Sequence, residues 1–146
     1  MQNSVKTACV TIISMLTLIG CSQKFSNSDL DGTWVGTDHV RNSRGISTTN
    51  KTVSLAVDEN GLISGTTKWS LLSGPGGNTK DAPAVEDIEK IIGAFDAASG
   101  KVYLVEMEEN GFWQGQLTSP NTMRIFLVQT GEKPVVAHMI LNRSAD

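Results

Sequence analysis

The sequence predicts an all-β fold, an eight-stranded antiparallel up-and-down β-barrel, preceded by a short apolar leader. Three observations predict it: short segments of strand-forming residues between turn residues, a recurring glycine pattern, and a hairpin segment that recurs at an offset of 50 residues. A barrel is favoured over a sandwich because a closed sheet has no exposed edge strand.

The first element is a leader with one positive charge and an apolar run. Lys6 is the only charged residue among the first seven, and residues 8–19 are interrupted only by Ser and Thr. The run is too short for a membrane helix, which needs about 20 apolar residues. It ends in Leu18-Ile19-Gly20-Cys21, which resembles the lipobox of bacterial lipoproteins. The resemblance implies cleavage between Gly20 and Cys21 and acylation of the Cys21 sulfur.

The leader also sets the expected location and domain organisation. Ser22 follows the cysteine, and the resemblance implies that a Gram-negative cell exports such a protein to its outer membrane. We therefore expect a signal peptide at 1–20, a lipidated cysteine and flexible tether at 21–29, and a barrel domain at 30–146 in the cell envelope. Cys9 leaves with the leader and Cys21 is acylated, so neither thiol remains for a disulfide.

The strands follow in order from the turn signals between them. In residues 83–92, Val85, Ile88 and Ile92 are at helical spacing, so a short helix before the fourth strand is left as an open alternative. Residues 41–50 and 73–84 are expected to be long loops at one end of the barrel. The expected strands are 32–40, 52–58, 62–71, 90–97, 101–108, 112–118, 123–129 and 135–142.

Three strands share the pattern Gly-x-large apolar-x-Gly. The large residues are Trp34, Ile63 and Trp113. Because alternate residues of a strand share a face, each of these side chains lies between two glycines on one side of the sheet. Glycines at this spacing suit strands that bend tightly into a barrel.

The hairpins set which side chains face inward. At residues 51–66 a three-residue loop pairs Val57 with Ile63 and Leu55 with Gly65, which keeps the apolar residues on one face. The same logic at residues 101–116 makes Met107 face Trp113 and leaves Glu106 and Glu108 in solvent. The aromatic and sulfur side chains then expected inside the barrel, or lining a ligand, are Trp34, Trp69, Tyr103, Met107 and Trp113.

The first strand carries a short family resemblance. Gly32-Thr33-Trp34 resembles the opening of lipocalins, and residues 30–34 are similar to the start of avidin-type barrels. The resemblance implies a barrel able to hold a small ligand. No lipocalin terminal helix or biotin-contacting pattern can be placed on the sequence, so it assigns no ligand and no site residue.

Charge and motifs favour binding over catalysis. The net charge is −3, and the leader contains one lysine and no acidic residue, so the mature chain is more acidic and has no basic patch for nucleic acid. The only histidines, His39 and His138, are not at metal-ligand spacing, and no nucleophile motif occurs. We expect no enzyme activity, no metal and no cofactor.

Two functions remain from the sequence. The first is a membrane-anchored module that binds an envelope protein, as an inhibitor, an immunity protein or an accessory subunit, through the loops 41–50 and 73–84. The second is a lipocalin-like barrel that binds a small apolar ligand between its aromatic walls. A barrel filled by its own side chains is the simpler interpretation of the interior.

Overall fold

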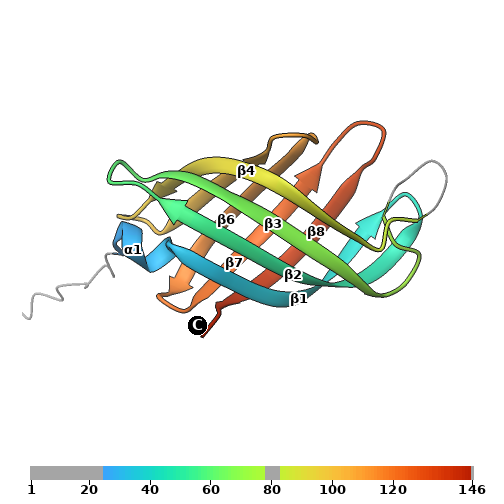
Figure 1. Cartoon of the computed structure of the whole chain (residues 1–146), viewed down its shortest axis with the longest axis horizontal. Coiled ribbons are helices and arrows are strands. Elements are labelled where there is room, and N and C mark those ends of the chain that lie inside the picture. Colours follow the sequence, from blue (N-terminus) through green and yellow to red (C-terminus); the bar gives the residue numbers. More distant parts are fainter. Residues whose placement is uncertain (1–24, 78–82, 146) are drawn as a thin grey trace, which may run out of the picture.

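The protein is a closed barrel of eight antiparallel strands, seen in a computed structural model that describes residues 25–77 and 83–145. Each strand pairs with the next in sequence, and β8 closes the barrel on β1 (Figure 1). This confirms the predicted up-and-down topology. The elements are α1 (Asn27–Leu30), β1 (Gly32–Asn42), β2 (Gly45–Val57), β3 (Leu62–Ser73), β4 (Glu86–Asp96), β5 (Lys101–Glu106), β6 (Gly111–Ser119), β7 (Thr122–Gln129) and β8 (Val135–Arg143).

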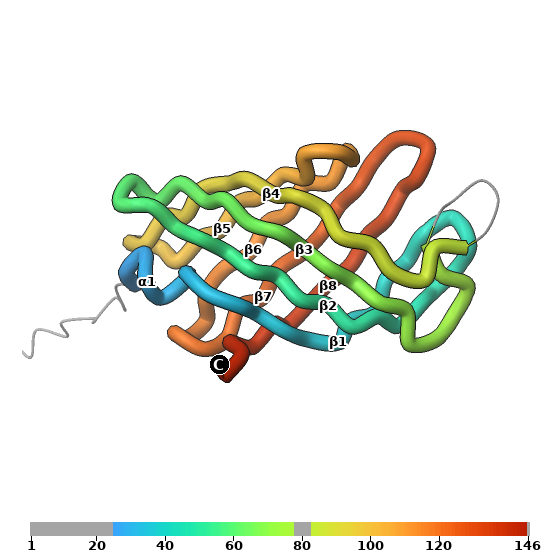
Figure 2. Tube along the Cα trace, in the orientation of Figure 1, coloured from blue at the N-terminus to red at the C-terminus, as the bar shows by residue number. Residues whose placement is uncertain are grey.

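The two ends of the barrel differ in how they are covered. The turns β2–β3, β4–β5 and β6–β7 lie at the end that holds α1, which we call the closed end (Figure 2). The other four connections lie at the opposite end, which we call the open end. At the open end, the connection between β3 and β4 contacts the end of β1. The Asn42 side-chain amide donates a hydrogen bond to the Gly76 carbonyl oxygen at 2.8 Å.

The closed end is plugged by the segment before β1. Leu30 is completely buried, and Trp34 Nε1 donates to the Leu30 carbonyl oxygen at 2.9 Å. The Phe25 backbone N–H donates to the Ala97 carbonyl oxygen at 3.1 Å. Residues 25–29, expected to belong to a flexible tether, therefore pack on the barrel. Gly20 and Cys21, the predicted cleavage and lipidation positions, lie outside the described residues.

The glycine pattern works as the sequence predicts. Trp34, Ile63 and Trp113 all point into the barrel and are buried. A Cβ on Gly65 would collide with the Ser54 carbonyl oxygen on β2, so this glycine permits the close approach of the two strands. The apolar core around Trp34, Val53 and Leu141 lies next to the closed end and extends as far as Leu127 and Ala137 on β7 and β8.

Two local predictions are wrong. Residues 83–92 contain no helix: β4 begins at Glu86, because its residues pair along β3, with Glu89 opposite Thr67. Ile91 and Phe95 point inward while Ile88 and Ile92 are exposed. Residues 41–50 are not a long loop either, since β1 and β2 continue as paired strands to a tight turn between Asn42 and Gly45.

The two hairpins have different outcomes. In the first, Val57 pairs with Ile63 and Leu55 with Gly65, as predicted. In the second, the partner of Trp113 is Leu104 rather than Met107. The predicted register of β5 was therefore wrong by three residues. Because three is an odd number, the inward and outward faces are exchanged. Glu106 lies inside the barrel, where it accepts a hydrogen bond from Trp113 Nε1 at 3.0 Å. All side chains of β5 consequently lie on the face opposite to the predicted one.

No helix among residues 25–77 and 83–145 has the length and apolar character needed to cross a membrane.

Candidate ligand cavity

The open half of the barrel contains a cavity of about 100 Å³ that opens to solvent. Its walls come from β1, β2, β3, β4, β5, β7 and β8 and from the loops at the open end. Apolar and polar side chains share the surface. Its apolar walls are formed by Val40, Trp69, Leu71, Ala84, Leu127 and Val135, and its polar walls include Ser47, Thr49, Lys51, Thr67, Asp87, Glu89, Glu106, Glu109, Gln129 and Lys133.

A buried lysine lies at the inner end of this polar surface. Lys51 is only 5% exposed and stands directly opposite Trp69 in the β2–β3 pairing. Its Nζ lies 5.3 Å from the centre of the Trp113 ring. Burial lowers the pKa of Lys51, against the attraction of Asp38 and Glu106 and Glu89. Lys51 therefore places a buried primary amine beside the carboxyl groups of the cavity.

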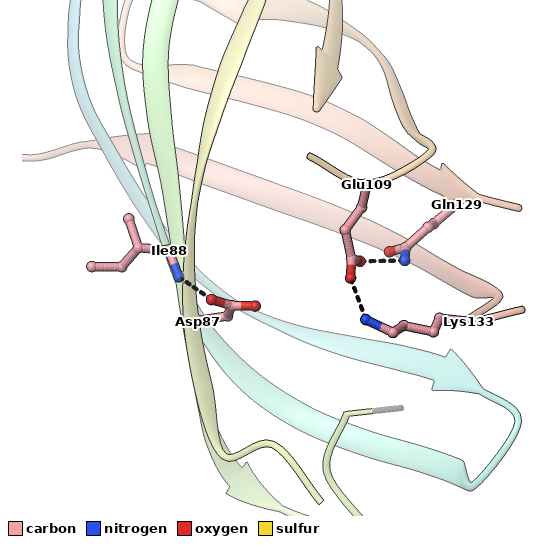
Figure 3. A network of polar contacts seen from close by, with 5 residues as sticks. All are labelled: Asp87, Ile88, Glu109, Gln129 and Lys133. Carbon is pink, nitrogen blue, oxygen red and sulfur yellow. Dashed lines mark hydrogen bonds and ion pairs between the residues drawn. The ribbon is translucent and has the colours of Figure 1, made fainter. Parts of the chain in front are cut away.

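Three carboxylates gather across the cavity, and we call Glu89, Glu106 and Glu109 the acidic wall. One oxygen from each lies within 4.8 Å of the others. Glu109 is held by donors, because Gln129 Nε2 donates to one oxygen and Lys133 Nζ to the other, the latter at 2.8 Å (Figure 3). Glu89 and Glu106 come from the neighbouring strands β4 and β5 and carry less compensation.

The electrostatics of the acidic wall oppose ionisation. Burial raises the pKa of Glu89 to about 7, and the charges of Glu106, Glu109 and Asp87 add to the effect. Burial also raises the pKa of Glu106, although its hydrogen bond from Trp113 and the charge of Lys51 act in the other direction. Near neutral pH Glu89 is therefore close to half protonated.

Several buried oxygens here have no hydrogen-bond partner in the protein. Among the described residues these atoms are Asp38 Oδ2, Thr67 Oγ1, Glu89 Oε2 and Glu106 Oε2. A buried polar atom without a partner costs about 1–3 kcal/mol. They cluster in the open half, where Asp38, Glu89 and Glu106 all act electrostatically on Lys51. This half of the barrel is therefore built at a cost in stability, which is typical of binding sites.

The residues predicted to line the interior divide into two groups. Trp34 and Trp113 are buried in the core, and half-buried Trp69 lines the cavity. Tyr103 and Met107 are wrongly predicted, because they lie on the outer surface with exposures of 37% and 59%. Both errors follow from the incorrect register predicted for β5, which exchanged its inward and outward residues.

The polar residues of the cavity were not among those predicted from the sequence to face the interior. Lys51 fell between the predicted loop 41–50 and the predicted strand 52–58. It is two residues before Val53 on the inward face of β2, so extending that strand places it inside. Glu89 fell in the segment 83–92, where a short helix was left open, and Glu106 was placed in solvent. The signal that could have located them is the alternation of inward and outward residues. It continues along each strand beyond the last apolar inward residue.

One solved structure of similar fold supports the barrel architecture. No family model and no curated protein matches the chain. Among solved structures, EF1p2_mFAP2b bound to DFHBI is similar with a TM-score of 0.55 and 14% identity, over 82% of this chain and 100% of that one. An S-type phycobiliprotein lyase from Guillardia theta aligns with a TM-score of 0.43 and 9% identity, over 82% of this chain and 91% of its own. The chain is thus a small up-and-down barrel with one filled half and one polar-lined, open half.

Proposed function

We propose that the protein binds a small molecule in the open half of its barrel. The observation that carries the proposal is the cavity, whose buried polar atoms lack partners while the other half is packed with apolar side chains. Binding sites combine apolar walls with a few polar groups in this way. EF1p2_mFAP2b, a barrel of similar fold, is bound to DFHBI, which supports a ligand role for this architecture.

The size and lining of the cavity limit the ligand. Pockets for drug-sized ligands measure about 300–1,000 Å³, whereas this cavity measures about 100 Å³. A ligand of few atoms fits inside, and a larger one extends through the mouth. Trp69, Leu71 and Leu127 offer it apolar contacts, while Lys51 and the acidic wall offer polar ones.

The experiment that tests the proposal fills the cavity without breaking a contact. Thr67 Oγ1 has no partner in the protein, so Thr67→Met fills cavity space with a larger side chain and removes no hydrogen bond. Thr66→Met, an outward-facing neighbour on β3, is the matched control. Protein purified from its native envelope is extracted and the extract is analysed by mass spectrometry. We expect a small molecule with the wild type and Thr66→Met and none with Thr67→Met; recovery from all three would contradict the proposal.

We also propose that the protein is a lipid-anchored envelope protein. The lipobox-like segment ending in Cys21 supports this, together with its position at the end of a charge-led apolar run. Phe25 and Leu30 pack on the closed end, so an anchor at Cys21 would direct that end toward the membrane and the cavity away from it. Mass spectrometry of the N-terminal peptide tests this: we expect diacylglycerol on Cys21, and an unmodified Met1 terminus would contradict it.

A second candidate function, binding of an envelope protein, is favoured by the outer surface of the barrel. Five exposed apolar side chains, one per strand from β4 to β8, pair in succession across the sheet, and we call them the outer row: Ile92, Val105, Phe112, Val128 and Val136. Exposed contiguous apolar surface is typical of protein interfaces.

Site-directed cross-linking tests this second function. A photo-reactive side chain at Phe112 should capture one defined envelope protein, and the same group at Gln116, an outward position on β6, should not. Capture of another copy of this chain, or equal capture from both positions, would contradict the proposal.

A further inference from the structure

We propose that the ligand of the cavity is a small organic cation, bound through a protonated primary amine by Thr67, Glu89 and Glu106. The inference rests on the proposed function, because it names the chemistry of the molecule that the open half holds. It is carried by the charge of the cavity and by the arrangement of unpartnered oxygens.

The charges that line the cavity favour a cation. Four acidic residues, Asp87 and the three members of the acidic wall, face two lysines. Lys133 is already paired with Glu109 at 2.8 Å. Lys51 forms no ion pair with a carboxylate among the described residues, and the buried Asp38 adds a further negative charge near it. An anionic ligand would meet this negative excess, whereas a cation reduces it.

The second observation is a buried hydroxyl beside the acidic wall. Thr67 is 3% exposed, lines the cavity, and has no partner for Oγ1. It stands directly opposite Glu89 in the β3–β4 pairing. Side chains in such pairs lie about 5 Å apart at Cβ. The hydroxyl and the carboxyl therefore present oxygens to the same part of the cavity.

The number and type of these oxygens match a primary amine. Thr67 Oγ1, Glu89 Oε2 and Glu106 Oε2 all lack donors among the described residues. A primary ammonium group carries three N–H donors and no acceptor. Hydrogen bonds from a cation to carboxylates are among the strong ones, so one such group both satisfies the three atoms and relieves the repulsion between Glu89 and Glu106.

The remaining walls suit the organic part of such a ligand. Trp69 lies opposite Asp87 in the β3–β4 pairing and lines the cavity with Leu71. Aromatic faces attract cations and pack against apolar groups. A metal ion suits the site less well, because calcium takes about 6–8 oxygens and both oxygens of Glu109 already accept hydrogen bonds from Gln129 and Lys133.

The experiment compares three ligands of one shape and different charge: benzylamine, benzyl alcohol and benzoate. Their affinities for the folded barrel are measured by isothermal titration calorimetry at pH 8. We expect benzylamine to bind about tenfold tighter than the alcohol or better, as one charge-assisted contact provides, and benzoate to bind weakest. Glu89→Gln with Glu106→Gln should remove the preference for the amine and retain alcohol binding. Glu108→Gln, an exposed glutamate in the β5–β6 loop, is the matched control.

A pH series of the wild-type protein tests the inference without any variant. The pKa of Glu89 is about 7 in the free protein, so an amine that needs the ionised carboxylate displaces a proton. We expect the benzylamine affinity to rise by about tenfold from pH 6 to pH 8, the change in the ionised fraction of one such group. The affinity of the alcohol should stay constant.

The outcomes separate this inference from the proposed function. Equal binding of amine and alcohol, both lost in Thr67→Met, would overturn the cation and keep the cavity as a ligand site. Micromolar binding of Ca²⁺ that displaces benzylamine would also overturn the organic cation. Absence of binding by all three compounds, with no molecule extracted from the native protein, would overturn the proposed function itself.

Discussion

Replacing Glu89 by glutamine should make the barrel more stable as the pH rises above about 4.5, with the full gain reached above about pH 7. Glu89 is half-buried in the acidic wall, and its pKa is raised from 4.5 to about 7. Between these two values the folded protein holds a proton that the unfolded chain has released. The folded protein therefore binds more protons in this range, and its stability falls as pH rises through it. Glutamine has the same shape and no proton to lose.

The size of the effect follows from the change in pKa. A rise from 4.5 to about 7 corresponds to about 3 kcal/mol at 1.4 kcal/mol per pKa unit. Solvent reaches the half-buried carboxyl and screens part of this interaction, which leaves about 1–2 kcal/mol at pH 8. In a domain of this size that raises the melting temperature by about 4–8 °C. At pH 4 the variant and the wild type should be equally stable.

Urea unfolding followed by tryptophan fluorescence measures this at pH 4, 6 and 8. Glu86→Gln is the matched control, because Glu86 lies on the same strand and is exposed. We expect the free-energy difference between Glu89→Gln and wild type to grow from zero to its full value across the series, and no such growth for the control. A Glu89→Gln variant whose stability follows pH in parallel with the wild type would refute the electrostatic account of the acidic wall.

Three further predictions concern the plug, the strand contacts and the cavity. Leu30→Ala should lower the free energy of unfolding by about 2–5 kcal/mol because Leu30 is fully buried, whereas exposed Leu62→Ala should change it by less than about 0.5 kcal/mol; equal losses in thermal melts would show that the plug is not part of the fold. Gly93→Ala places a methyl group against the Tyr103 carbonyl oxygen and should cost about 1–3 kcal/mol, and an unchanged melting temperature would disprove the tight contact. Trp69→Ala should weaken ligand binding by about tenfold or more through lost apolar and cation–π contact, and calorimetry showing wild-type affinity would remove Trp69 from the site.

The hairpins show how far side-chain alternation can be followed from sequence. Around Val57 and Ile63 the two faces of the hairpin differ clearly in polarity, so one loop length gave a consistent pairing, and the structure has it. On β5 the residues from Val102 to Val105 are all apolar, so either set of alternate residues could face inward. The structure buries Val102 and Leu104. The charged Glu106 shares their face, and its polarity favoured the opposite, incorrect choice.

The cavity was hidden from the sequence analysis by the same rule that located the core. Apolar alternation marks residues that fill the barrel, but the open half presents Lys51, Thr67 and Glu89 to its interior. Because of polar residues at inward positions, two predicted strands began too late, at Thr52 and Lys90, whereas β2 and β4 begin at Gly45 and Glu86. Their burial depends on pairing with neighbouring strands distant in sequence, which a local pattern does not contain.

The plug at the closed end depends on tertiary contacts as well. Residues 22–29 are mostly polar and carry no strong pattern. Leu30 and Phe25 become buried or half-buried only because the barrel end supplies the Trp34 ring and the Ala97 carbonyl as partners.

The most direct test of the account is a nuclear magnetic resonance titration of the three tryptophan indole N–H signals with benzylamine. Trp69 lines the cavity, Trp113 donates its indole proton to Glu106, and Trp34 donates to Leu30 in the closed end. We expect the amine to shift the Trp69 and Trp113 signals with one shared affinity and to leave the Trp34 signal unchanged. Saturable binding that moves none of the three, or that moves Trp34 most, would contradict a ligand site in the open half of the barrel.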